Sequence, residues 1–223
     1  ATLCEREGIW LHVDAAYGGA LALLPERRAQ FVGLERADSL VVNPHKWIMT
    51  PMDCSVLWTR HPDVLRRAFS LTPEYLRTSE QDVALSYSDY SFQLGRRFRA
   101  LKLWFVLRAF GLEGIRARLR HHCDLARRFA GWVDATPDWE LRAPVGMSVV
   151  CFRYRPADVT RDTDLEVVNA AILERVNRSG EVFLSHTKLA GEYVLRVAVG
   201  NLRTDESHLA RAWGLLQEAA AAI

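Results

Sequence analysis

Lysine is scarce in this chain, and its scarcity makes each lysine informative. Of 29 basic residues only three are lysine, at Lys46, Lys102 and Lys188, and arginine supplies the rest. The formal net charge is only +2, and the arginines alternate with acidic residues instead of forming a basic block. Because nucleic-acid-binding segments concentrate their basic residues, we expect no nucleic-acid partner.

Cysteine and long apolar segments are also in short supply. The four cysteines, Cys4, Cys54, Cys123 and Cys151, are far apart and form no Cys-x-x-Cys pair. This spacing argues against a disulfide framework or a zinc ribbon and is typical of a reducing compartment. No apolar segment is long enough to cross a membrane, and no signal peptide is visible. We therefore expect a cytoplasmic protein with no membrane partner.

One short cluster, His121-His122-Cys123-Asp124, has the residue types of a metal site. However, adjacent residues of a helix point about 100° apart, so they cannot easily share one ion. His122 also falls on the apolar stripe of a helix that begins near Leu112, which predicts a histidine in the core. We expect no metal site.

The sequence also lacks an initiator methionine, and its first predicted strand, residues 9–13, begins almost at once. A parallel sheet needs helices on both faces and strands on both sides. We therefore expect this chain to be the C-terminal half of a longer enzyme.

The first segment whose side chains could take part in a reaction is Asn43-Pro-His-Lys-Trp47. It follows a β-branched apolar strand at residues 39–42. The primary amine of Lys46 can lose a proton and condense with an aldehyde, whereas an arginine guanidinium cannot. Taken alone, the segment is equally compatible with a surface lysine on a turn.

A second segment favours a reactive role for Lys46 over a surface lysine on a turn. Asp14 stands at the carboxyl end of the predicted strand 9–13, and the small residues Ala15, Ala16, Gly18 and Gly19 follow it. In open parallel sheets, ligands bind beyond the carboxyl ends of the strands. A carboxylate for a ring nitrogen and a lysine for an aldehyde are the pair that pyridoxal phosphate requires. The simpler alternative is that Asp14 only caps a turn.

The order of the elements predicts two domains. A helix at residues 25–36 joins strands 9–13 and 39–42 into a right-handed parallel unit, and strand 54–59 returns antiparallel. Residues 70–93 have no sustained period, which is typical of a functional lid or of a disordered loop. A long helix ends at Gly111, a second follows, and strands then alternate with helices, with strands expected at residues 147–154, 181–186 and 192–199. This order indicates a separate α+β domain from about residue 101.

The two segments together identify a family. His12-Val-Asp-Ala-Ala-Tyr-Gly-Gly19 and Asn43-Pro-His-Lys-Trp47 closely resemble the group II pyridoxal-phosphate-dependent decarboxylases, in particular the aromatic-L-amino-acid decarboxylase branch. The resemblance extends over essentially the whole chain, through Asp53-Cys-Ser55, Pro73-Glu-Tyr-Leu76, Leu94-Gly-Arg-Arg-Phe-Arg99, Leu101-Lys-Leu-Trp-Phe-Val106, Val150-Cys-Phe-Arg153 and Val194-Leu-Arg196. It implies an α/β fold: residues 1–100 would be the C-terminal part of a fold type I large domain with a mostly parallel sheet. Residues 101–223 would be the small α+β domain.

The resemblance also implies roles for five residues near the cofactor. Lys46 would hold pyridoxal 5'-phosphate covalently, and Asp14 would pair with its ring nitrogen. Ala16 would lie against the ring face, while His45 and Asn43 would approach the phosphate.

The implied reaction is decarboxylation of an L-amino acid, most readily an aromatic one, in a homodimer with its active site at the subunit interface. Tyr75, within the catalytic loop at about residues 70–93, would deliver a proton to the substrate. Some relatives instead form an aldehyde by decarboxylation with oxidative deamination, and they commonly carry phenylalanine at this position, so Tyr75 favours the amine. A third possibility is a catalytically inert, truncated fragment.

Overall fold

The computed structural model describes residues 1–70, 85–159 and 161–223. It divides into two compact units, residues 1–115 and 116–223, which are described separately below. The division falls inside the helix α4 (Arg99–Asp134). The domain boundary expected at about residue 101 lies in the first turn of the same helix and stays a prediction.

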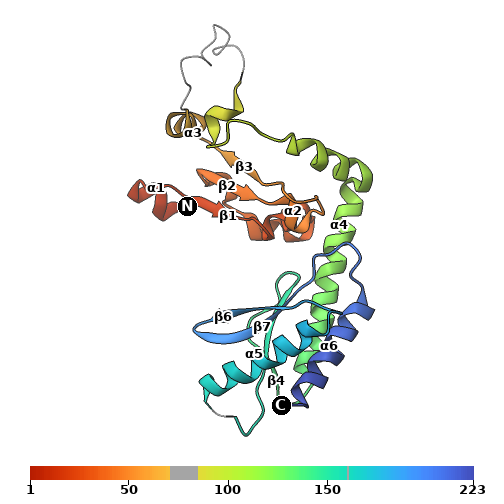
Figure 1. Ribbon diagram of the computed structural model, residues 1–223. Helices are drawn as coiled ribbons and strands as arrows, with labels where there is room; N and C mark the ends of the chain where they lie inside the picture. Colours follow the sequence, from red (N-terminus) through yellow and green to blue (C-terminus); the bar gives the residue numbers. More distant parts are fainter. Residues whose placement is uncertain (71–84, 160) are drawn as a thin grey trace. The chain divides into compact units, whose positions relative to one another are not determined.

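A three-stranded sheet forms the centre of the first unit (Figure 1). Strand β1 (His12–Asp14) pairs in parallel with β2 (Ser39–Val42), and β2 pairs antiparallel with β3 (Val56–Thr59). The parallel and antiparallel pairings are those that the sequence predicts, although β1 is shorter than expected. The sheet is therefore mixed, and the chain as a whole is an α/β structure with small sheets.

The connection between β1 and β2 differs from the expected α-helix. It consists of three 3₁₀ segments, η1 (Gly18–Leu23), η2 (Pro25–Phe31) and η3 (Leu34–Arg36). Gly33 separates the last two with φ 92°, a left-handed conformation that interrupts a right-handed helix.

The first unit has further elements outside this sheet. They are the helices α1 (Thr2–Glu7), α2 (Pro44–Trp47) and α3 (Pro62–Phe69), the 3₁₀ helix η5 (Tyr87–Tyr90) and the start of α4. The predicted break at Gly111 is present as a kink, with φ 63° and ψ 173° inside α4. Only glycine adopts this combination at little cost, so the break is a property of that residue.

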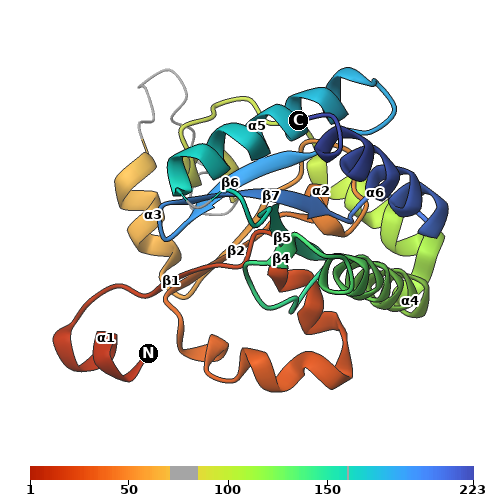
Figure 2. The ribbon, with the colours of Figure 1, turned by 90° about the horizontal axis from the view of Figure 1, so that it is seen from below.

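The second unit contains a four-stranded antiparallel sheet with the order β4-β5-β7-β6 (Figure 2). Its strands are β4 (Trp139–Leu141), β5 (Val149–Tyr154), β6 (Ser185–Leu189) and β7 (Glu192–Ala198). Helix α5 (Asp162–Arg178) packs along β7 and against α6 (Glu206–Ala220). The mixture of an antiparallel sheet with segregated helices is the α+β arrangement expected from the sequence.

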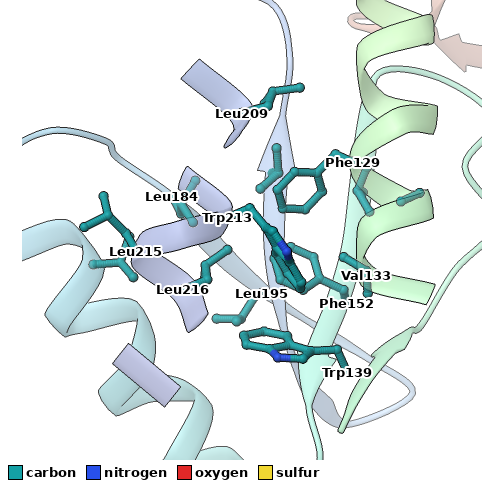
Figure 3. Close-up of a cluster of buried hydrophobic side chains, with 14 of the residues drawn as sticks. Phe129, Val133, Trp139, Phe152, Leu184, Leu195, Leu209, Trp213, Leu215 and Leu216 are labelled. Carbon is teal, nitrogen blue, oxygen red and sulfur yellow. The ribbon is translucent and has the colours of Figure 1, made fainter. Parts of the chain in front are cut away.

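Four aromatic rings meet among the aliphatic side chains in the core of the second unit (Figure 3). Trp213 of α6 lies with its ring centroid 4.9 Å from that of Trp139 and 5.6 Å from that of Phe129. Phe129 in turn meets Phe152 of β5 edge to face at 5.3 Å. His122 of α4 is also completely buried, which confirms the predicted core histidine.

Candidate active site

The carboxyl ends of β1 and β2 bring two chemically useful side chains to one edge of the sheet. Asp14 is the last residue of β1 and pairs in register with Val41 of β2. Lys46 lies in α2, the single helical turn that directly follows β2. Because the two strands are parallel, both side chains arise beyond the same edge, as the sequence predicts.

The loop after β1 is held by main-chain hydrogen bonds to β2 and to the residue that follows it. The Ala15 N–H donates to the Val41 carbonyl at 3.0 Å, and the Asn43 N–H donates to the Ala16 carbonyl at 3.0 Å. The Ala16 N–H donates to Oδ1 of Asp14, also at 3.0 Å. These bonds fix Ala16 beside the carboxylate of Asp14.

Gly19 explains why small residues follow Asp14. A Cβ atom at this position would lie 2.7 Å from Cγ2 of Val42 and 3.1 Å from Cβ of Ala15. Glycine therefore permits η1 to pack directly on the end of β2.

His45 is anchored by one neighbouring residue, Cys54. The His45 N–H donates to the Cys54 carbonyl at 3.3 Å, and its ring Nδ1 lies 3.0 Å from the Cys54 nitrogen and 2.6 Å from the Cys54 oxygen. In the tautomer in which Nδ1 accepts from the Cys54 N–H, Nε2 carries the ring proton. Nε2 is then the ring atom of His45 that can donate to an anion.

Asn43 is oriented in a similar way by Ser55, whose Oγ donates to the Asn43 Oδ1 at 2.6 Å. The amide oxygen is thus used within the protein, and the amide nitrogen keeps both of its protons for a ligand. Asn43 consequently presents donors, and so does His45 in the tautomer with the proton on Nε2; donors are the requirement for binding a phosphate.

Asp14 and Lys46 are both exposed, and within the described part of the chain neither of them forms an ion pair. A primary amine with no carboxylate on it is suited to react with an aldehyde, and a carboxylate with no cation on it is suited to bind a protonated ring nitrogen. The set formed by Asp14, Ala16, Asn43, His45 and Lys46 therefore fits pyridoxal phosphate. All five residues were predicted from the sequence, and Tyr75, which was predicted with them, lies outside the described residues.

Sequence reasoning missed the contacts that hold the site segments in place. The rings of Tyr17 and Trp47 stack on each other, and Asp53, directly before Cys54, pairs with Arg99 of α4. The Arg99 guanidinium holds the pKa of the Asp53 carboxyl below its usual range. The only feature of the sequence that could have indicated a role for Trp47 at the site was its position directly after Lys46.

Two features are absent from residues 1–70, 85–159 and 161–223. This part of the chain contains no group of three or more His, Cys, Asp or Glu side chains that could hold a metal ion. It also contains no helix with the length and apolarity that crossing a membrane requires.

Comparison with known proteins identifies what this arrangement resembles. Residues 1–155 match the pyridoxal-dependent decarboxylase conserved domain. The chain is 42% identical to tryptophan decarboxylase TDC2 of Camptotheca acuminata, over 100% of this chain and 45% of that protein. It is also 42% identical to a phenylacetaldehyde synthase from a Rosa hybrid cultivar, over 99% of this chain and 45% of the other.

The fold is shared as well. The crystal structure of Oryza sativa TDC with PLP and tryptamine superimposes with a TM-score of 0.91 at 34% identity, covering 99% of this chain and 46% of that one. The chain thus spans less than half the length of the relatives that it matches.

Proposed function

This chain belongs to the pyridoxal-dependent decarboxylase family, and we propose that its protein converts an aromatic L-amino acid into the corresponding amine and carbon dioxide. The observation that carries the proposal is the placement of Asp14 and Lys46, exposed and without ion pairs among the described residues, beyond one edge of the sheet. The names of the relatives, which concern tryptophan and phenylacetaldehyde, support an aromatic substrate.

Pyridoxal phosphate, when bound, supplies a ring that accepts the electron pair of the breaking bond between the substrate α-carbon and its carboxylate. Lys46 would hold the cofactor through its amine and release it to the amino group of the substrate. Asp14 would hold a proton at the ring nitrogen, and its orientation by the Ala16 N–H suits this role. A neutral residue at position 14 could not keep that nitrogen charged.

The other three residues would bind and orient the cofactor. Ala16, fixed between Asp14 and Asn43, would lie against the ring face, where a larger side chain would exclude the ring. Asn43 and His45 would donate to the phosphate through the nitrogen atoms that Ser55 and Cys54 leave available.

The product depends on the step that follows loss of carbon dioxide. Tyr75 would return a proton to the substrate α-carbon and so complete the amine. The relatives include an aldehyde synthase at the same 42% identity as the tryptophan decarboxylase, so overall similarity does not decide between the two products. A Tyr75→Phe variant should lose amine formation by about 10²–10⁴-fold, the usual contribution of a general acid. It should gain aldehyde with dioxygen as the oxidant, releasing ammonia and hydrogen peroxide.

The same proposal extends to the whole protein. Residues 1–100 would form the C-terminal part of a fold type I cofactor-binding domain, completed by chain that the relatives have and this sequence does not. Residues 101–223 would form its small domain. A homodimer with the active site at the subunit interface, in the cytoplasm, would be the working form. Sedimentation and cell fractionation test these two points directly.

The central experiment replaces Lys46 in the protein that carries this chain. Lys46→Arg should abolish both the visible absorbance of the bound cofactor and the release of carbon dioxide from L-tryptophan or L-tyrosine, because a guanidinium stays protonated. The matched control is Lys188→Arg, since Lys188 pairs with Glu166 in the second unit. A Lys46→Arg protein with parental absorbance and turnover would refute the proposal, and a parent protein inert in both assays would support the truncated-fragment alternative.

A further inference from the structure

The segment Asp53–Ser55 has a different partner at each of its three positions. Ser55 donates to the side chain of Asn43, and Cys54 contacts both the main chain and the ring of His45. Asp53 points to α4 instead, where its Oδ2 accepts from Nε of Arg99 at 2.8 Å. We refer to Asp53–Ser55 as the clamp segment.

We propose that the ion pair between Asp53 and Arg99 positions the turn that carries Lys46, by fixing the clamp segment against helix α4. This inference rests on the proposed function, since it concerns the lysine that would hold the cofactor. The connection consists of one ion pair, one peptide bond, the contacts of Cys54 with His45, and the peptide bond from His45 to Lys46.

The geometry favours Asp53 as the attachment point to α4. Arg99 is the first residue of α4, and Lys102, one turn later, places its Nζ 3.9 Å from Oδ1 of the same carboxylate. Two cations from one helix therefore face one acid, each on a different oxygen. Residues three apart on a helix lie on the same side, so this convergence follows from the helix itself.

The exposure of the Asp53–Arg99 ion pair indicates that it positions the turn more than it stabilises the whole fold. The Asp53 side chain is 47% exposed and that of Arg99 is 21% exposed, so water and salt screen the pair. Ion pairs of this kind contribute little to the stability of the whole fold. They can still select one geometry of a turn, and small displacements at a reacting group reduce its reactivity strongly.

The test uses the fact that this sequence has only three lysines. The protein is incubated with pyridoxal phosphate over a range of concentrations and reduced with borohydride, and labelling of Lys46 and Lys188 is measured by peptide mass spectrometry. Asp53→Asn and Arg99→Gln should raise the half-saturating concentration at Lys46 by on the order of 10-fold or more. Labelling of Lys188, in the second unit, should not change.

Three further variants test whether loss of the ion pair between Asp53 and Arg99 causes the weaker labelling of Lys46. Asp53→Glu should recover part of the labelling at Lys46, because the charge is restored with a longer side chain. The double variant Asp53→Asn/Arg99→Gln should be no weaker than either single variant, because both remove the same interaction. Glu5→Gln breaks the exposed ion pair with Arg36 in the same unit and should leave Lys46 labelling at the parental level.

Thermal unfolding of the same variants distinguishes a loss of positioning at Lys46 from a loss of stability. The midpoints of Asp53→Asn and Glu5→Gln should both fall within ~4 °C of the parent, as expected for exposed ion pairs in a chain of this size. Parental labelling of Lys46 in Asp53→Asn would overturn the inference, and so would a loss of labelling that follows the loss of thermal stability in every variant. If Lys46 of the parent is not labelled in preference to Lys188, the proposed function itself fails, which is a distinct result.

Discussion

The ring of Tyr17 lies parallel to the indole of Trp47, with 4.6 Å between the ring centroids and 2° between the ring planes. Tyr17 belongs to the loop that follows Asp14, and Trp47 directly follows Lys46. Trp47 is only 1% exposed and Tyr17 is half-buried, so the indole side of the stack is covered from solvent. This contact joins the two segments that carry the proposed cofactor ligands.

The stack predicts a difference between two substitutions of Tyr17. Tyr17→Phe and Tyr17→Leu both remove the hydroxyl group, so comparing them isolates the ring. Tyr17→Leu should be less stable than Tyr17→Phe by about 0.5–1.5 kcal/mol in the free energy of unfolding, the value of an aromatic pair beyond its buried area. It should also label more weakly at Lys46. Equal unfolding midpoints and equal labelling would show that the ring contact does not hold the site.

Gly19 yields a prediction about packing at the end of β2. Gly19→Ala should lower the free energy of unfolding by about 1–3 kcal/mol, because the added methyl group overlaps Val42. Adding Val42→Ala should return part of that loss by making room. Gly95→Ala is the control, since a Cβ at Gly95 meets nothing within 4 Å. If both glycine variants unfold at the same urea concentration, the close approach has no energetic consequence.

Local patterns were sufficient to predict the two strand ends from which the candidate site residues follow. A β-branched run that ends in Asn43-Pro44, and an apolar run that ends in Asp14, identify two strand ends from a few residues each. The contacts between segments could not be predicted in this way. Asp53 and Arg99 are separated by 46 positions, and nothing in either neighbourhood indicates the other residue.

Secondary structure was predicted less well where side chains or glycine override the local pattern. The strand expected at residues 181–186 is instead β6, Ser185–Leu189. Asn177 accounts for the shift, because its side chain bonds both the N–H and the carbonyl of Leu184 and holds that residue outside the sheet. The helix expected at residues 25–36 is divided by the left-handed Gly33.

Asp14 leads to a prediction about catalysis without loss of binding. Asp14→Asn keeps the size of the side chain and an oxygen to accept from Ala16, so cofactor labelling at Lys46 should remain near the parental level. Turnover of the aromatic amino acid should fall strongly, because a neutral amide cannot hold the ring nitrogen protonated. Turnover within twofold of the parent would assign Asp14 a structural role only. Asp63→Asn, at an exposed acid in the first turn of α3, is the control.

His122 predicts how the stability of the second unit depends on pH. Its side chain is completely buried, and burial lowers its pKa to about 4, with the neighbouring charges of Arg118 and His121 acting in the same direction. The unfolded chain, with an ordinary histidine pKa near 6.5, therefore binds more protons than the folded chain between these two values. The contribution of neutral His122 to stability is fully present above the unfolded-state pKa. As pH falls towards 4, the free energy of unfolding decreases by up to about 3 kcal/mol.

The variant that tests this is His122→Gln, which keeps a polar side chain but does not titrate. The difference in urea unfolding midpoint between pH 7 and pH 4.5 should be smaller in His122→Gln than in the parent, whatever the variant's stability at pH 7. His121→Gln is the matched control, because His121 is adjacent and exposed. It should stay close to the parental difference, since burial is the largest cause of the shift at His122. Parallel pH profiles for His122→Gln and the parent would mean that other groups, such as the carboxylates paired with arginine in this unit, govern its response to acid.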